Sequence, residues 1–310
     1  VENHEELRAE LRSEGIRFSS QTDTEVIAHL VQHYIEKGQS FEKAVFNTIK
    51  KLKGAYALGI LNKKEPEQLI GVRNQSPLVL GKGFQENFIG SDVMALAPVT
   101  NKFIYLEDGQ VAILNKTKAD VRTATNQKAR TKTHEVESNA YTTDLAGYKH
   151  FMEKEIYEQP NAILNTLDGR VGGEDILENI FGEGSTDLFA KVKRIQITAC
   201  GTSLHAGRVA ANWFSAIAGL PTQIDYASEY RYKNPYVDKN TLLVTISQSG
   251  ETADTLAALR YAKDQNYLAS LAICNVPTSS LARESDFLLL TNAGPEIGVA
   301  STKAFTTQLI

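Results

Sequence analysis

The chain has 310 residues, enough for two domains of ordinary size, and its 42% hydrophobic and 23% charged residues are typical of a globular protein. The net charge of −4 argues against nucleic acid or an anionic membrane as a partner, and no apolar run approaches the length of a membrane span. Two cysteines, Cys200 and Cys274, lie in apolar runs, which indicates free thiols in a reducing compartment. We therefore expect a cytoplasmic protein.

The first half of the chain changes from helical to strand-like patterns. Apolar residues between positions 26 and 34 recur at helical spacing after Asp23 and Thr24, which suit a helix N-cap. Residues 41–54 predict a second helix that ends at Gly54. Short apolar segments such as AYALGILN and QLIGVRN follow, separated by Gly, Asn, Asp and Pro. Helices followed by a run of strands predict a layered α+β domain.

The second half has a different pattern. Residues 115–148 are polar and predict an irregular boundary, and a helical pattern broken at Pro160 follows. From residue 192, four apolar runs alternate with helical stretches: VKRIQITAC, NTLLVTIS, LASLAICN and FLLLTNAG. Strands that are apolar throughout predict an α/β domain whose parallel sheet is covered by helices on both faces.

Three of the predicted strands end in unusual loops. They are CGTSLHAG (200–207, the first loop), SQSGET (247–252, the serine loop) and GVASTKAF (298–305, the third loop). Each joins small hydroxyl residues to the start of a helix, whose free N–H groups and dipole attract anions. In an open parallel sheet, ligands bind beyond the carboxyl ends of the strands. The three loops together predict a phosphate site built from neutral donors.

Each of these features has a simpler alternative. A single Ser-x-Ser-Gly is usually a helix cap and a turn, and only the repetition at successive strand ends favours a shared site. Glu251 suits a helix start, with a role in sugar chemistry as the weaker alternative. Lys303 is either an anion contact or a solvated lysine at a helix start. The P-loop and Rossmann fingerprints are absent, which favours a phosphorylated small molecule over a nucleotide.

Several motifs identify a family. CGTS, SQSGETADT and EIGVASTKAFTTQ resemble a sugar isomerase (SIS) domain. With EIYEQPNAI (155–163), TDTEVIAHL (22–30) and GAYALGIL (54–61), they resemble the glutamine–fructose-6-phosphate aminotransferase (isomerizing) family over essentially the whole chain. Because the chain begins VENHEEL and ends in the helix-like TKAFTTQLI, we expect a fragment that lacks both ends.

The resemblance implies a domain layout. Residues 1–138 would be the later part of a glutaminase domain with an N-terminal-nucleophile hydrolase-like fold, here incomplete. Residues 139–185 would be a linker and a helical lead-in. Residues 186–310 would be the first SIS domain, with a flavodoxin-like parallel sheet, truncated at its C-terminal end.

The resemblance also implies an activity. Such enzymes hydrolyse glutamine and pass the ammonia to the SIS domains, where fructose 6-phosphate becomes glucosamine 6-phosphate for UDP-GlcNAc biosynthesis. The implied ligands are these sugar phosphates and glutamine, the implied assembly is a homodimer, and no metal or organic cofactor is expected. The N-terminal cysteine and the Asn-Gly pair of the glutaminase chemistry have no counterpart here. We therefore expect no catalytic residue in this chain, which alone would be inactive.

The family's binding residues can be carried over position by position. The residues implied to bind the sugar phosphate come from all three loops: Thr202, Ser203, Ser247, Gln248, Ser249, Thr252, Val299, Ala300 and Ser301. Asp23 would grip the α-amino group of glutamine, although from the residues alone it is a helix cap. Gln21 departs from the glutamate that the family often has there, which removes one charge near the site.

Two other functions remain as alternatives. SIS domains also occur in non-catalytic sugar-phosphate sensors, but a regulator of that kind would more often carry a DNA-binding helix-turn-helix and a basic face. An unrelated nucleotide-binding α/β protein lacks the phosphate fingerprint it would need. The glutaminase-like first half favours the enzyme.

Overall fold

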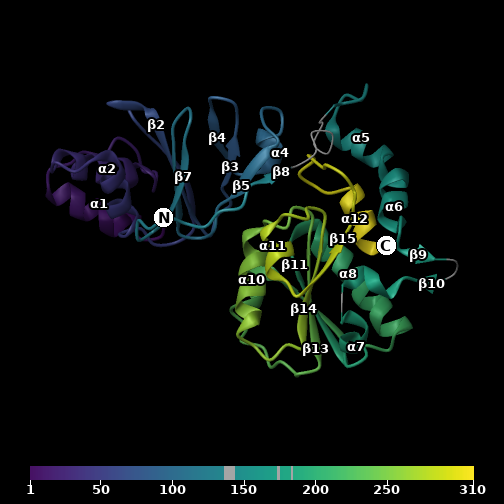
Figure 1. Ribbon diagram of the computed structural model, residues 1–310. Helices are drawn as coiled ribbons and strands as arrows, with labels where there is room; N and C mark the ends of the chain where they lie inside the picture. Colours follow the sequence, from purple (N-terminus) through teal and green to yellow (C-terminus); the bar gives the residue numbers. More distant parts are fainter. Residues whose placement is uncertain (136–143, 173–174, 183) are drawn as a thin grey trace. The chain divides into compact units, whose positions relative to one another are not determined.

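A computed structural model describes residues 1–135, 144–172, 175–182 and 184–310 (Figure 1). The chain divides into two compact units, Val1–Thr142 and Thr143–Ile310. The domain boundary expected between residues 138 and 139 lies outside the described residues.

The N-terminal unit begins with helices, as the sequence predicts. They are α1 (His4–Ser13), α2 (Glu25–Glu36) and α3 (Phe41–Ile49). The predicted end of α3 at Gly54 is wrong. The Asn3 side chain donates to the Lys51 carbonyl and accepts from the Lys53 N–H, both at 2.9 Å, and so binds backbone groups that a longer helix would use.

Two antiparallel sheets follow in this unit. One has the order β1-β2-β6-β7 and the other β4-β3-β5-β8, with α4 (Val93–Leu96) beside the second. The bounds are β1 Tyr56–Asn62, β2 Glu65–Asn74, β3 Val79–Lys82, β4 Asn87–Gly90, β5 Lys102–Tyr105, β6 Gln110–Leu114, β7 Ala119–Thr123 and β8 His134–Glu135. The predicted strands are confirmed up to β6. The predicted boundary at 115–148 contains the division between the two units, but the irregular structure predicted there is wrong at residues 119–123, because β7 pairs with β6 and buries Val121 despite its polar sequence.

The N-terminal unit is layered as helices, sheet, sheet and helix (Figure 1). Ile70 and Val72 of β2 pack against α1–α3 on one face of the first sheet. Its other face packs against the second sheet through Ala112 and Leu114. At Gly71 the two sheets approach so closely that a Cβ would lie 3.2 Å from Leu78 Cδ2. The α+β expectation for this half is confirmed.

The C-terminal unit is built on a five-stranded sheet of order β12-β11-β13-β14-β15, in which every neighbouring pair is parallel. The bounds are β11 Arg194–Ala199, β12 Thr222–Tyr226, β13 Thr241–Ser247, β14 Ala269–Cys274 and β15 Phe287–Leu290. This is the 2-1-3-4-5 order of flavodoxin-like sheets. The four predicted strands are confirmed, whereas β12 was not predicted because its sequence, TQIDY, is too polar to resemble a buried strand.

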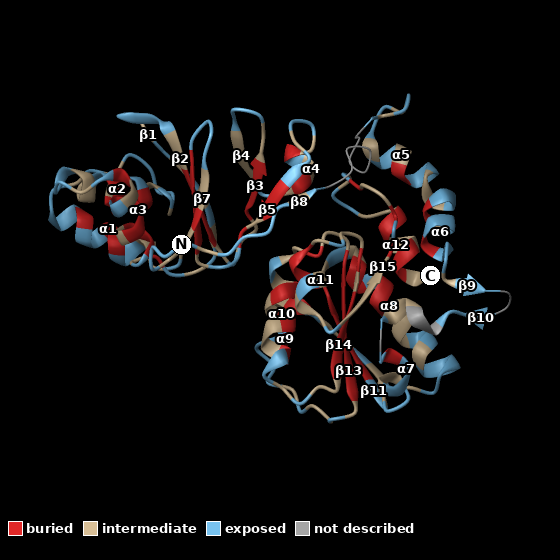
Figure 2. Ribbon diagram, viewed as in Figure 1, coloured by how far each residue is buried: buried red, intermediate tan, exposed pale blue. Residues whose placement is uncertain are grey.

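Helices cover both faces of this sheet, and β13 is buried along its whole length (Figures 1 and 2). Side chains of α9, α10 and α11 form one core, and those of α7 and α8 form the other. The bounds are α5 Phe151–Tyr157, α6 Gln159–Leu167, α7 Ser185–Phe189, α8 Gly201–Ile217, α9 Ala227–Tyr230, α10 Ala253–Lys263, α11 Ser280–Glu284 and α12 Lys303–Leu309. A short hairpin (β9 Val171–Gly172, β10 Asp175–Ile176) and a 3-10 helix (η2 Glu178–Phe181) precede α7.

None of the helices within the described ranges is long and apolar enough to cross a membrane.

The two cysteines predict a chemical test of this core. Burial raises the pKa of the Cys274 thiol, and Cys274 has no exposed surface, whereas Cys200 is half-buried at the end of β11. Since the thiolate is the reactive form, we expect a maleimide at pH 8 to modify Cys200 in the native protein and Cys274 only after unfolding. Mass spectrometry of the labelled peptides checks this. Equal labelling of both thiols in the native state would contradict the buried position of β14.

Candidate functional site

The parallel pairing of β11 and β13 creates the candidate site. Ala199 lies opposite Ile246, so the first loop and the serine loop leave the sheet at the same edge. The helices that follow these strands, α8 and α10, pack on opposite faces of the sheet. The strand order reverses here, and a crevice opens at such a point in open α/β sheets.

The helix starts at this edge supply unpaired N–H groups. The first intrahelical bond of α8 runs from the Leu204 N–H to the Cys200 carbonyl at 3.3 Å, and that of α10 from the Leu256 N–H to the Thr252 carbonyl at 3.0 Å. The N–H groups before these positions have no acceptor within their own helix. Two helix N-termini therefore favour negative charge at the crevice.

The hydroxyl groups of the serine loop shape its backbone. Ser247 Oγ accepts from the Gly250 N–H at 3.0 Å and lies 3.2 Å from Thr252 Oγ1. Ser249 Oγ accepts from the Glu251 N–H at 3.2 Å. Because Ser249 uses an oxygen lone pair in this bond, its O–H remains available as a donor to an anion.

The serine loop is fixed to the neighbouring helix α11. Gly250 has a φ of +66°, and a Cβ there would lie 2.1 Å from Ser279 Oγ. The Gly250 carbonyl accepts from the Leu281 N–H at 3.0 Å. Glu251 Oε1 accepts from the Ser280 N–H at 2.7 Å, so this carboxylate joins the loop to α11. Glycine at position 250 is thus required both by its φ and by space.

Asn275 connects the serine loop to the chain after β15, and sequence reasoning missed it. Its N–H donates to the Gln248 carbonyl at 3.1 Å. Its side chain accepts from the Ala293 N–H and donates to the Gly294 carbonyl, both at 2.7 Å. The signal was present, because LASLAICN places an asparagine directly after a buried strand at the same sheet edge.

The remaining residues of the first two loops are placed as follows. Thr202 and Gln248 are half-buried at the edge, and the structure gives their side chains no hydrogen bond within the described residues. Ser203 is 7% exposed, and its Oγ accepts from Gln308 Nε2 of α12 at 3.1 Å. Ser203 therefore faces the protein interior at α12.

The third loop lies apart from these contacts. Val299 and Ala300 are exposed and Ser301 is half-buried, and among the described residues none of the three bonds to the first or the serine loop. The solvated lysine considered at position 303 is wrong. Lys303 is 3% exposed, and its Nζ lies 2.6 Å from Glu158 Oε2, so its charge is neutralised by a half-buried carboxylate.

Asp23 lies on the loop before α2. Its carboxylate accepts from the ammonium group of Val1 at 2.5 Å, which lowers the pKa of Asp23 below its ordinary value. The N-cap position of α2 belongs to Thr24, and no side chain caps this helix. The Asp23 carboxylate therefore forms an ion pair with Val1 and does not cap α2.

The side chains of Arg8 and Glu25 bind the backbone of residues 19–22, just before Asp23. Buried Arg8 donates to the Ser20 carbonyl at 3.0 Å and to the Thr22 carbonyl at 2.8 Å. Glu25 accepts from the N–H groups of Ser19 at 2.6 Å and Ser20 at 2.7 Å, which hold its pKa well below the usual range. Sequence reasoning missed Arg8, because a charged residue on a polar-rich helix gives no sign of burial.

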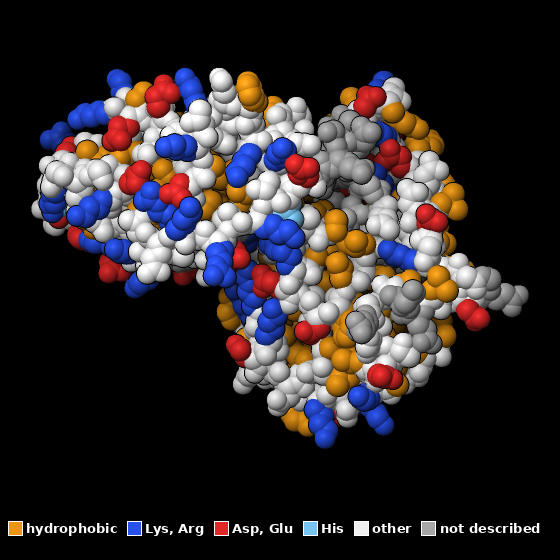
Figure 3. All heavy atoms as spheres, viewed as in Figure 1, with side chains coloured by type: hydrophobic (Ala, Val, Ile, Leu, Met, Phe, Trp, Pro, Cys, Tyr) orange, Lys and Arg blue, Asp and Glu red, His pale blue; other side chains and the backbone are white. Residues whose placement is uncertain are grey.

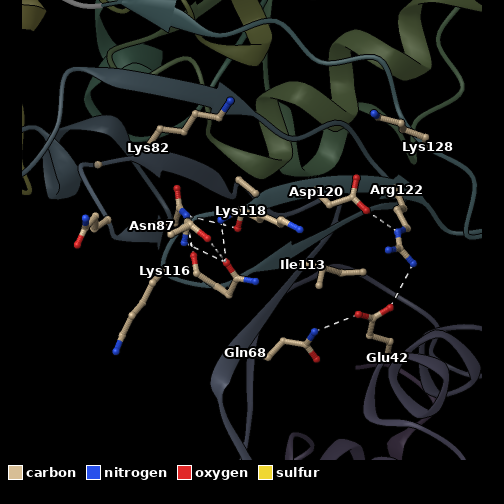
Figure 4. A pocket seen from close by; sticks show the side chains of 15 residues that line it. Glu42, Gln68, Lys82, Asn87, Ile113, Lys116, Lys118, Asp120, Arg122 and Lys128 are labelled. Atoms are coloured by element: carbon tan, nitrogen blue, oxygen red, sulfur yellow. Dashed lines mark hydrogen bonds and ion pairs between the residues drawn. The ribbon is translucent and has the colours of Figure 1, made fainter.

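A separate pocket of about 900 Å³ lies in the N-terminal unit, at the turns after β3 and β6 (Figure 4). It contains none of the predicted site residues. Arg122 binds Asp120 at 2.8 Å and Glu42 at 3.2 Å, so both carboxylates of the pocket are paired. Its lining also includes four lysines: Lys82, Lys116, Lys118 and Lys128.

The fit around Gly250 predicts a stability effect. Gly250→Ala combines a left-handed backbone, which costs about 1–2 kcal/mol, with overpacking against Ser279, which costs about 1–3 kcal/mol more. The matched control is Gly219→Ala, because Gly219 has a φ of +65° and nothing within 4 Å of its Cβ position. Urea unfolding should show that Gly250→Ala lowers the free energy of unfolding more than Gly219→Ala does. Equal losses would mean that Ser279 does not confine the loop.

Comparisons with known proteins agree with this geometry. Residues 188–310 match the SIS domain family, and residues 1–98 match the glutamine amidotransferase domain family. The chain is 52% identical to the glutamine–fructose-6-phosphate aminotransferase (isomerizing) of Pseudomonas putida and 51% identical to the protein of that name from Escherichia coli K12. Each match covers 100% of this chain and 51% of the relative, so the chain spans about half the length of the curated relatives it matches.

A solved structure supports the assignment of the second unit. The C-terminal domain of glucosamine-fructose-6-phosphate aminotransferase from Francisella tularensis superposes with a TM-score of 0.53 and 53% sequence identity, over 54% of this chain and 47% of that chain. The matched families, the relatives and the parallel sheet agree with one another. The chain therefore joins a region of the glutamine amidotransferase domain family to a SIS domain, and over its whole length it is similar to glutamine–fructose-6-phosphate aminotransferases (isomerizing).

Proposed function

We propose that this chain is part of an amidotransferase that uses glutamine-derived ammonia to convert fructose 6-phosphate to glucosamine 6-phosphate. The observation that carries the proposal is the shared sheet edge after β11 and β13, where the N-termini of α8 and α10 and the serine loop follow the two strands. Backbone N–H groups and hydroxyls can surround a phosphate group without a lysine or arginine. A sugar phosphate fits such a site because its phosphate is the anion and its hydroxyls need further polar partners.

The nine loop residues divide into three roles in this proposal. Ser249, Thr252 and Thr202 donate to the phosphate, together with the Gln248 side chain. Ser247 and Ser203 hold the loops in place through the bonds described above. The closing segment, which we define as residues 297–301, covers the sugar through Val299, Ala300 and Ser301. The full exposure of Val299 supports this role, because an apolar side chain there gains by covering a ligand.

In the N-terminal unit, Asp23 would bind the α-ammonium group of glutamine. A carboxylate suits this cation, because a carboxylate and an ammonium group form a charge-assisted hydrogen bond. The helix–sheet–sheet–helix layering supports the N-terminal-nucleophile hydrolase-like fold expected for such a domain. No catalytic residue of either reaction is assigned to these 310 residues, so binding is the property to measure.

Further parts of the proposal concern partners and layout. Exposed apolar side chains on α5 and α6 support a homodimer or a further SIS domain as a neighbour, and Figure 3 shows apolar side chains gathered on the visible face of this unit. The exposed apolar residues of α5 and α6 include Ile156, Tyr157 and Leu164. A cytoplasmic location, and domains of 1–138 and 186–310 with a linker of 139–185, belong to the same proposal.

The amidotransferase is favoured over the sugar-phosphate sensor by the N-terminal unit. A sensor has no use for a glutamine amidotransferase domain, yet residues 1–98 match that family.

Calorimetric titration with fructose 6-phosphate tests the phosphate site. Ser249→Ala removes a hydroxyl donor at the crevice, and we expect its dissociation constant to rise about tenfold, as for a hydrogen bond to a charged group. Ser215→Ala, an exposed serine on α8, is the control and should bind as the wild type does. Unchanged affinity in Ser249→Ala, or equal affinity for fructose without its phosphate, would contradict the proposal.

The glutamine site needs a chain whose own ammonium group cannot compete. Acetylation of Val1 removes that charge and frees the Asp23 carboxylate. We expect L-glutamine to shift the NMR signals of residues 22–24 in the acetylated protein, and Asp23→Asn to abolish these shifts. Identical responses of the acetylated protein and its Asp23→Asn variant would exclude Asp23 as the ligand for the ammonium group.

A further inference from the structure

The EIYEQP motif has no part in the phosphate site, yet it contacts the third loop. The motif spans the junction of α5 and α6. Glu155 binds the backbone at residues 297 and 298, Glu158 binds Lys303, and Gln159 accepts from Thr306 Oγ1 at 2.5 Å. These partners lie more than 140 residues away in the chain, so the contacts belong to the tertiary fold.

Glu155 makes the central contact. Its Oε1 accepts from the Ile297 N–H at 2.6 Å and from the Gly298 N–H at 3.1 Å, and its Oε2 lies 3.2 Å from the same Gly298 nitrogen. The Glu155 side chain is only 3% exposed. A buried carboxylate is costly unless several donors satisfy it, so these two N–H groups are what keeps it in place.

Contacts on the other side hold the end of the closing segment. Glu296 is 8% exposed, and its Oε1 accepts from the Thr302 N–H at 2.7 Å and from the Ala304 N–H at 3.3 Å. The ion pair of Lys303 with Glu158 holds the start of α12. The backbone is therefore fixed before and after Val299 and Ala300, which themselves are exposed.

Burial of apolar side chains does not hold this segment. Ile297 is 41% exposed and Val299 is fully exposed, so neither side chain fixes the backbone by packing. Space, in contrast, is tightly limited on the Glu155 side, where a Cβ at Gly298 would lie 2.6 Å from Glu155 Oε2. Gly298 and Glu155 thus form one interlocking contact, by which we mean that the carboxylate binds the Gly298 N–H and leaves no room for a Cβ at that position.

We propose that Glu155 is a positioning residue, whose carboxylate sets the backbone of the closing segment in the conformation that covers the sugar of a bound sugar phosphate. The inference rests on the proposed function for its ligand. The contact itself can be tested without any ligand. In the proposed function the serine loop holds the phosphate. Loss of the Glu155 carboxylate should therefore weaken binding of the sugar part of the ligand and leave the affinity for phosphate alone unchanged.

Hydrogen exchange followed by NMR tests the contact. In Glu155→Ala we expect the Ile297 and Gly298 amides to exchange at least tenfold faster, while amides of β13 stay unchanged. In Glu155→Gln the exchange rates of these two amides should lie between those of the wild type and Glu155→Ala, because the glutamine amide oxygen still accepts a hydrogen bond. Glu153→Ala is the matched control, since Glu153 is exposed on the same helix and binds the Lys149 N–H instead. Unchanged exchange at 297 and 298 would overturn the proposal.

Ligand binding separates positioning from general stability. For Glu155→Ala we expect at least tenfold weaker binding of fructose 6-phosphate and less than a twofold change for inorganic phosphate. An equal loss for both ligands would mean that Glu155 only maintains the fold. If the wild type bound neither ligand, the proposed function would fail, and the exchange result would still decide whether Glu155 holds the segment.

A second variant changes the same contact at Gly298. Gly298→Ala forces a methyl group against Glu155 Oε2, so it should weaken fructose 6-phosphate binding as Glu155→Ala does. In the double variant Glu155→Ala/Gly298→Ala the methyl group contacts no carboxylate. The losses of fructose 6-phosphate affinity caused by the two substitutions should therefore not add. Additive losses would show that the two residues act independently and would contradict the interlocking contact.

Discussion

The parallel pairing of β11 with β13 is the constraint on which the C-terminal unit depends. It brings two strand ends to one sheet edge, and the helices that follow pack on opposite faces. The N-termini of α8 and α10 therefore both follow strand ends at this edge. The proposed phosphate site thus depends on topology, because free N–H groups at helix starts attract anions.

The loops at this edge are held by hydroxyl and carboxylate groups that bind their backbones. Ser247 and Ser249 accept from the serine loop itself, Glu251 fastens it to α11, and Asn275 joins it to the chain after β15. Glu155 holds the closing segment in the same way. A site preorganised by such bonds loses little entropy when it binds a ligand.

The sequence predicted the alternation of strands and helices and the hydroxyl loops, because apolar runs and small residues at strand ends are local patterns. It did not predict β12 or β7, whose polar edge sequences resemble loops. Nor did it show that Arg8, Glu155 and Lys303 are buried, since their partners lie far away in the chain or are backbone groups. Charged residues are expected at the surface, and only the tertiary structure reveals the exceptions.

The most direct test of the account is an NMR titration of the chain with glucosamine 6-phosphate, read at every backbone amide. The account predicts saturable shifts at residues 202–203 and 248–253, with smaller shifts at 297–301. The lysine-lined pocket of the N-terminal unit offers a rival anion site within the same molecule. Shifts confined to Lys82, Lys118 and Lys128, or no saturable shifts at the sheet edge, would contradict a sugar-phosphate site between β11 and β13.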